Sequence, residues 1–187
     1  MDVQSLKLLF RVIVRPHQEY GNVIWQPPVT EREKANAYKV ENVLRRATRM
    51  VPELRHLPYE ERLAKIGLPS LWYRQQRADV IETWKLTNDH YNLSVPIHRR
   101  VGDACQGGQR PVTRKATNGL VKMAPPNGNK KRGHFFSYRV VNLWNSLPDK
   151  VTTAPSLNSF KNGVDKTWRD KAYRSPFGPF ALWSVFE

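Results

Sequence analysis

Apolar residues recur at helical spacing along most of the chain, and residues 30–51 (TEREKANAYKVENVLRRATRMV) show this most clearly. The apolar positions there are Val40, Val43, Leu44, Ala47, Met50 and Val51. They span about 120° of a helical face, the width of a stripe that packs on a core. Thr30 stands three residues before Glu33, the spacing of a capping box. This segment therefore predicts a long amphipathic helix.

The opposite side of this helix is basic. Lys39, Arg45, Arg46 and Arg49 all fall there by helical projection. One interpretation is a solvated surface, and the other is a ridge that lies against phosphates. We predict these four side chains as candidate nucleic-acid contacts.

Two shorter helices are predicted before this one. Residues 3–14 are amphipathic, and Pro16 predicts a break or kink at Arg15. Residues 17–25 form the second predicted helix, with Tyr20, Val23 and Ile24 directed inward.

Four further helices follow from capping and periodicity. The first starts near Pro58 and ends at Gly67, and the second is capped by Ser70 and runs to about residue 88. The third covers residues 135–147, and the last runs from Ser156 to Trp168.

Composition changes between residues 91 and 133, where Gly, Pro, Asn and basic residues dominate. Residues 110–114 and 120–123 are compatible with two short strands of a hairpin, and the alternative is a basic loop. Such a segment is either a solvated linker or one that orders on phosphates. Its candidate contacts are Arg114, Lys115, Lys130, Lys131 and Arg132.

The predicted fold class is mainly α, a helical bundle with a basic loop or small β-hairpin near residues 110–123. The predicted division has four parts. They are a helical module at 1–90, a basic linker at 91–133, a C-terminal helical pair at 134–170 and an irregular aromatic tail at 171–187.

Charge narrows the expected partners. The 187 residues include 31 Lys and Arg against 16 Asp and Glu, a net charge of +15. This excess favours a polyanion, with nucleic acid ahead of an anionic membrane surface. No apolar run is long enough to predict a membrane span, and the N-terminus lacks the features of a signal peptide. The lone Cys105 excludes an internal disulfide and suits a cytoplasmic or nuclear location.

Candidate chemistry is sparse. The sequence has no glycine-rich phosphate loop and no HExxH motif, and its acidic residues are scattered singly. Metal-dependent phosphoryl transfer needs convergent carboxylates. We therefore predict no catalytic residue, no metal ligand and no cofactor.

Three blocks of sequence resemble a known series. They are VIVRPHQEYGNVIWQP, KVENVLRRATRMVPELRHLPYEERLAKIGLPSLWYRQQRADVIETWKL and HFFSYRVVNLWNSLPDKVTTAPSLNSFKNGVDKTW. In order and spacing they resemble the region after the polymerase palm in jockey-like non-LTR (LINE-type) retrotransposon reverse transcriptases. The resemblance covers residues 4–168, and its most specific parts are the RPH-x-EYG-x-x-x-W and WNSLP…APS-x-x-SF patterns.

The resemblance implies a thumb and C-terminal segment that grip a template–primer duplex by its backbone. The aromatic-Ala-Asp-Asp signature of the family's polymerases is absent, and residues 77–80 (RADV) do not match it. The sequence thus predicts a truncated, non-catalytic remnant with low-affinity, salt-sensitive binding to RNA/DNA duplexes. A palm supplied by another chain is a minor alternative.

A second interpretation is a structural or protein-interaction module. In it, exposed aromatic residues bind a protein partner. The candidates are Trp72, Trp84, Trp144, Trp168 and the aromatic tail.

Overall fold

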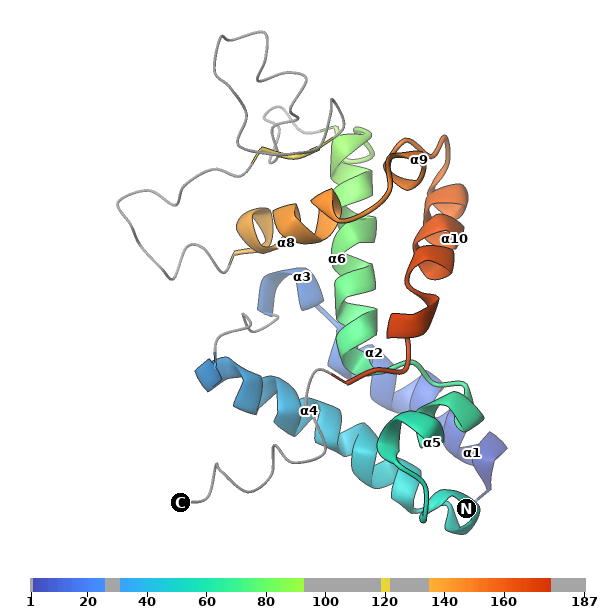
Figure 1. Ribbon diagram of the computed structural model, residues 1–187. Coiled ribbons are helices and arrows are strands. Elements are labelled where there is room, and N and C mark those ends of the chain that lie inside the picture. The colour runs from blue at the N-terminus through green and yellow to red at the C-terminus, as the bar shows by residue number, and fades with distance from the viewer. Residues whose placement is uncertain (1, 26–30, 93–118, 122–134, 176–187) are drawn as a thin grey trace, which may run out of the picture. The chain divides into compact units, whose positions relative to one another are not determined.

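The computed structural model describes residues 2–25, 31–92, 119–121 and 135–175, and these residues are mainly helical, as predicted (Figure 1). They belong to two compact units. Unit 1 comprises residues 1–75 and 170–187, and unit 2 comprises residues 76–169. The boundary falls inside helix α6 (Leu71–Thr87).

Unit 1 begins with a helical segment that continues through the proline. Helix α1 (Val3–Leu9) leads into a π-helical turn η1 (Phe10–Val14) and then into α2 (Arg15–Glu19). Of the predicted break or kink at Arg15, the break is wrong, because helical structure continues through this residue. A proline ring clashes with the carbonyl four residues earlier, and π-helical turns are one way in which helices absorb such an irregularity. Here the Arg15 N–H bonds to the Phe10 carbonyl, five residues back.

The predicted helix over residues 17–25 is confirmed only in part, because it is interrupted near its middle. Gly21 adopts a left-handed conformation (φ 64°) and separates α2 from the short helix α3 (Asn22–Trp25). This interruption changes the phase of the helical pattern, so Tyr20 is 83% exposed and Ile24 is 89% exposed. Asn22 is buried instead, and its Nδ2 donates to the Gln75 carbonyl at 3.3 Å.

Helix α4 (Glu31–Arg49) confirms the long predicted helix, while Thr30 of the capping box lies outside the described residues. The buried stripe differs from the predicted one. Leu44 is buried as predicted, but Val43 and Met50 are exposed. The buried positions are Glu41, Leu44, Arg45 and Thr48, which follow the i, i+3, i+4, i+7 pattern. Polar side chains thus occupy much of the inward face.

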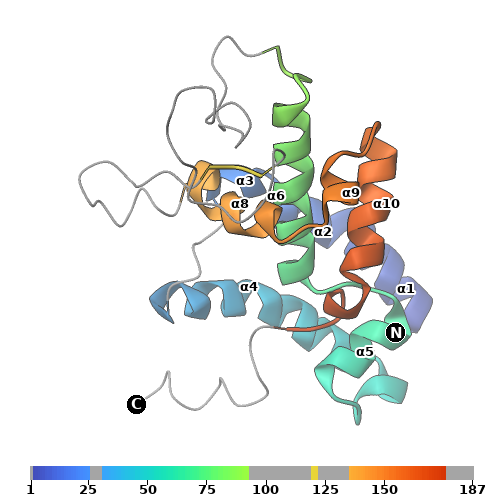
Figure 2. The same cartoon turned by 45° about the horizontal axis from the view of Figure 1, so that its top comes forward.

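Helix α5 (Tyr59–Ile66) follows a 3₁₀ turn, η2 (Pro52–Leu54), and ends at Gly67 as predicted. Gly67 has φ 69°, and the Leu63 carbonyl accepts from the N–H groups of Gly67 and Leu68. Figures 1 and 2 show α5 beside the C-terminal end of α4. The core joins α1, η1, α4 and α5 through a cluster of apolar residues: Leu6, Phe10, Leu44, Val51, Leu54, Tyr59, Leu63, Ile66 and Leu68.

Unit 2 packs the C-terminal part of α6 with α8 (Phe136–Asn145), α9 (Asp149–Thr152) and α10 (Leu157–Thr167). Ser156 caps α10 by accepting from the Ser159 N–H at 3.2 Å, as predicted. Phe160 lies at the centre of the core, stacked against Trp84 and Trp144 with centroid distances of 5.9 and 5.8 Å. The rest of the apolar core consists of Val80, Leu120, Val140, Val141, Leu147, Val151, Ala154, Val164 and Trp168.

Most of the predicted hairpin lies outside the described residues. Within the described residues 119–121, Leu120 is buried in unit 2. Its N–H donates to Asn145 Oδ1 at 2.9 Å, and its carbonyl accepts from Asn145 Nδ2 at 3.0 Å. The Asn145 amide therefore makes the pair of hydrogen bonds to the Leu120 backbone that a neighbouring β-strand would make.

Candidate nucleic-acid interface

The outward side of α4 carries exposed basic side chains. Lys39, Arg46 and Arg49 are exposed there. They do not pair with a carboxylate among the described residues. This part of the predicted basic ridge lies on the surface, where a long flexible cation can reach a phosphate.

Arg45 is not part of this surface, which corrects the sequence prediction. Its side chain is buried, and its guanidinium carbon lies 4.5 Å from the ring centroid of Tyr59 and 5.4 Å from that of Tyr38. A guanidinium over an aromatic face gains a cation–π interaction that partly offsets the loss of water. Arg45 therefore serves the interior of unit 1.

Glu41 lies one helical turn before Arg45 and is almost fully buried. Its Oε1 accepts from the Tyr59 hydroxyl at 2.5 Å, and its Oε2 accepts from the Trp72 N–H at 3.2 Å. Burial raises the pKa of the Glu41 carboxyl despite these hydrogen bonds. Burial also raises the pKa of the Tyr59 hydroxyl, and the negative charge of Glu41 raises it further. The carboxylate links α4, α5 and the first turn of α6.

Arg62 of α5 continues this polar interior. It is 3% exposed, its Nε donates to Thr48 Oγ1 at 3.0 Å, and its Nη1 donates to the Leu57 carbonyl at 2.7 Å. Its guanidinium carbon also lies 5.6 Å from the Tyr59 ring centroid. Nη2 is buried and has no hydrogen-bond partner among the described residues. A buried, unsatisfied guanidinium nitrogen is costly, so this group calls for an acceptor.

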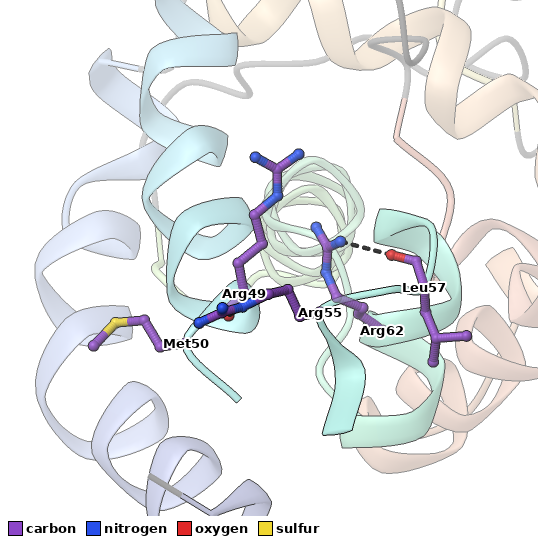
Figure 3. Close-up of a pocket in the computed structure, with 5 residues that line it drawn as sticks. All are labelled: Arg49, Met50, Arg55, Leu57 and Arg62. Atoms are coloured by element: carbon purple, nitrogen blue, oxygen red, sulfur yellow. Dashed lines mark hydrogen bonds between the residues drawn. The ribbon is translucent and has the colours of Figure 1, made fainter. Parts of the chain in front are cut away.

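A pocket of about 530 Å³ opens where α4 ends and α5 begins, lined by Arg49, Met50, Arg55, Leu57 and Arg62. Figure 3 shows the side chains of Arg49 and Arg62 extending toward the same side, and it marks the hydrogen bond from Arg62 to the neighbouring Leu57 carbonyl. Arg55 Nε donates to the Arg49 carbonyl at 3.4 Å. This bond satisfies one free carbonyl at the C-terminal end of α4.

The pocket is positively charged. Within the described part of the chain, no carboxylate lies within salt-bridge distance of Arg49, Arg55 or Arg62. The pKa of Arg62 is lowered by its burial and then by the charges of Arg49 and Arg45. Like charges held together without a counter-ion form a ready site for an anion.

The other predicted contacts lie in the basic linker. Arg114, Lys115, Lys130, Lys131 and Arg132 fall outside the described residues. Among the described residues, no group of three or more His, Cys, Asp or Glu is arranged to hold a metal ion. Within the same ranges, no helix has the length and apolar character needed to cross a bilayer.

The predicted aromatic surface is largely wrong. Trp84, Trp144 and Trp168 are at most 4% exposed and belong to the core of unit 2. Trp72 is partly buried, and the tail after Ser175 lies outside the described residues. Aromatic residues at helical spacing pack inward here because their large apolar area stabilises the core.

Arg55 and Arg62 were missing from the sequence prediction. Arg62 had a detectable signal, since Tyr59, Arg62, Leu63 and Ile66 share one helical face and a cation interrupts that apolar stripe. Arg55 lies in an irregular turn and carried no such signal.

No protein-family model, curated protein or solved structure matches the chain. The resemblance to reverse transcriptases thus remains a hypothesis from the sequence.

Proposed function

We propose that this chain binds the sugar–phosphate backbone of an RNA/DNA duplex without sequence preference, as the remnant of a non-LTR reverse transcriptase. The surface for this binding is the exposed side of α4, with Lys39, Arg46 and Arg49, continued by the arginine pocket. The net charge of +15 adds long-range attraction to any polyanion.

One observation carries the proposal: the guanidinium groups of the pocket have no carboxylate partner among the described residues. Elsewhere in the chain, arginines at similar positions between helices are paired. Arg77 contacts Asp165, Arg139 contacts Asp79, and Arg74 contacts Glu19. A cation that has no internal counter-ion keeps its charge available for phosphate.

We also propose that these residues contribute no phosphoryl-transfer chemistry of their own. Asp79 and Asp165 are held by arginines, and Glu41 by the Tyr59 hydroxyl. Metal-assisted transfer requires carboxylates that converge on a common point. These three carboxylates are instead held by separate partners. Primer extension on a polyadenylate template with Mg²⁺ or Mn²⁺ is expected to give no product. Extension that survives repurification contradicts the proposal.

The binding proposal is tested by fluorescence anisotropy with a short RNA–DNA hybrid at several salt concentrations. Replacing Lys39, Arg46 and Arg49 by Ala is expected to lower the slope of log K against log salt by about one for each phosphate-binding side chain removed. Two hybrids of unrelated sequence should be weakened equally, because backbone binding does not depend on sequence. A triple variant with wild-type affinity and slope contradicts the proposed surface.

A second candidate function, binding of a protein partner, is favoured by a different surface. Leu8, Leu9, Val12 and Ile13 of α1 and η1 are 66%, 45%, 63% and 56% exposed. Contiguous exposed apolar residues are typical of protein interfaces. Such an interface is insensitive to salt, whereas phosphate binding weakens steeply as salt rises.

A further inference from the structure

We propose that the pocket lined by Arg49, Arg55 and Arg62 is a binding site for a phosphomonoester, the doubly charged phosphate of a strand end or of a free mononucleotide. This inference rests on the proposed function, because it names which phosphate one part of that surface selects. It adds a preference for terminal phosphate to the sequence-independent attraction along α4.

The charge of the pocket supports a terminal phosphate over an internal one. A phosphomonoester carries about −1.5 to −2 charges at pH 7 and has three strong acceptor oxygens. An internal phosphodiester carries a single negative charge. Three arginines line the pocket, and none of them has a carboxylate within salt-bridge distance among the described residues. The more highly charged group offsets more of their mutual repulsion.

Arg62 provides a fixed positive charge beside this ligand. Two of its nitrogens are held by Thr48 and Leu57, so its guanidinium plane is set before a ligand arrives. Nη2 stays buried with no acceptor among the described residues. A charge held in place in this way loses little freedom when an anion binds. The direct hydrogen bonds to phosphate then come from the exposed Arg49 and Arg55.

Arg49 and Arg55 supply exposed, adjustable cations at the same pocket. Arg55 also caps α4 by donating to the Arg49 carbonyl. Arg49 lies in the last turn of α4, where the helix dipole favours a cation. Helix capping explains these two residues in part. It does not explain why Arg62, on the next helix, is buried facing the same pocket.

The pocket volume of about 530 Å³ lies within the usual range for small-molecule sites, about 300–1,000 Å³. A mononucleotide or the last nucleotide of a strand can therefore enter it. This size supports a ligand larger than an inorganic ion.

The test compares two RNA–DNA hybrids of one sequence, whose RNA strand has a 5′-phosphate in one and a 5′-hydroxyl in the other, bound to the whole chain. The phosphorylated hybrid is expected to bind about tenfold more tightly, as one charged hydrogen bond allows. In Arg49→Ala/Arg55→Ala this preference should disappear. The matched control, Lys39→Ala/Arg46→Ala, removes the same charge outside the pocket. It should weaken binding of both hybrids equally and keep the preference.

Competition separates the two sources of phosphomonoester. If a nucleoside 5′-monophosphate displaces the phosphorylated hybrid and the nucleoside does not, the site recognises the phosphomonoester of a free mononucleotide as well as that of a strand end. Failure of the monophosphate to compete restricts the site to strand ends. Both results support the pocket.

Equal affinity for the two hybrids overturns the inference and leaves backbone binding intact. A preference that survives in Arg49→Ala/Arg55→Ala also overturns it, because the selective site then lies elsewhere. Absence of binding to both hybrids in the wild-type protein overturns the proposed function itself. Circular dichroism of each variant verifies that helicity is unchanged.

Discussion

The pocket of unit 1 and the helix packing of unit 2 use arginine in opposite ways. In unit 2, Arg139 meets the buried Asp79 with two hydrogen bonds of 2.9 and 3.0 Å, and Arg77 meets Asp165 at 2.5 and 2.7 Å. In the pocket, Arg49, Arg55 and Arg62 line one cavity without a carboxylate among the described residues. Paired guanidiniums join helices, whereas unpaired ones keep charge for a ligand.

The interiors of the two units also differ in where they place charged side chains. Unit 2 is built on stacked aromatic rings around Phe160, and its ion pairs join the helices that surround this core. Unit 1 carries a polar interior of Glu41, Arg45 and Arg62 next to its apolar cluster. A polar interior is expensive unless it is satisfied. In unit 1 this polar interior includes Arg62, which also lines the pocket.

The largest expected effect comes from breaking a pair in unit 2. Asp79→Ala removes the carboxylate that accepts two bonds from Arg139 at a site where Asp79 is 2% exposed. Losing one partner of a buried ion pair costs about 3–5 kcal/mol. Urea denaturation measures the decrease in stability. Asp165→Ala is the control, because its half-exposed pair should contribute less than about 1 kcal/mol. Equal effects of the two substitutions contradict the structural role of the buried pair.

A smaller effect is expected from Glu41 in unit 1. Glu41→Ala leaves the Tyr59 hydroxyl and the Trp72 N–H without the acceptor that they share. The unsatisfied buried hydroxyl of Tyr59 costs about 1–3 kcal/mol, and the part-buried Trp72 N–H adds less because water can reach it. Glu41→Gln keeps an acceptor oxygen and should cost less at pH 7. If Gln destabilises as much as Ala, the negative charge, and not the hydrogen bonding, maintains the network.

The pH dependence of Glu41→Gln sharpens this test. Burial raises the folded-state pKa of Glu41, so its protonated form is favoured in the folded protein. The resulting stability is present below the unfolded pKa of about 4.3 and is lost as pH rises through the folded value. The wild type should therefore lose stability relative to Glu41→Gln as pH rises above the unfolded pKa. A difference that stays constant or grows in favour of the wild type contradicts the raised pKa.

The smallest expected effect is on stability when the pocket arginines are removed. Arg49→Ala/Arg55→Ala should change the free energy of unfolding by less than about 0.5 kcal/mol per residue, because both side chains are exposed and lack a carboxylate partner among the described residues. Thermal melts in low salt provide the measurement. A large destabilisation shows that these arginines serve the fold, and it weakens their assignment to a ligand.

The sequence predicted most helices because their periodicity and caps are local signals. Gly67 and Ser156 ended and started helices where expected. The sequence did not predict the π-helical turn before Pro16. Whether a helix ends at a proline or accommodates its ring through such a turn depends on the surrounding packing, which the local pattern does not contain. The interruption at Gly21 was missed for a similar reason, since a lone glycine is also tolerated within a helix.

The candidate site was predicted only in part. Charge and spacing identified Lys39, Arg46 and Arg49 on the outer side of α4, but they placed Arg45 there as well. Helical projection assigns charged residues to solvent, whereas Tyr38 and Tyr59 provide Arg45 with a buried aromatic environment. The pocket itself depends on the packing of α4 with α5, which no single-helix pattern contains.

The most direct test of the central claim compares one unpaired arginine with one paired arginine. Binding of an RNA–DNA hybrid is measured by anisotropy at several salt concentrations for Arg49→Ala and Arg77→Ala. Both variants lose one positive charge, but only Arg49 lacks a carboxylate partner among the described residues. We predict that Arg49→Ala lowers the salt slope by about one and that Arg77→Ala leaves it unchanged. Equal slopes in the two variants would contradict the claim that unpaired guanidiniums form the phosphate-binding surface.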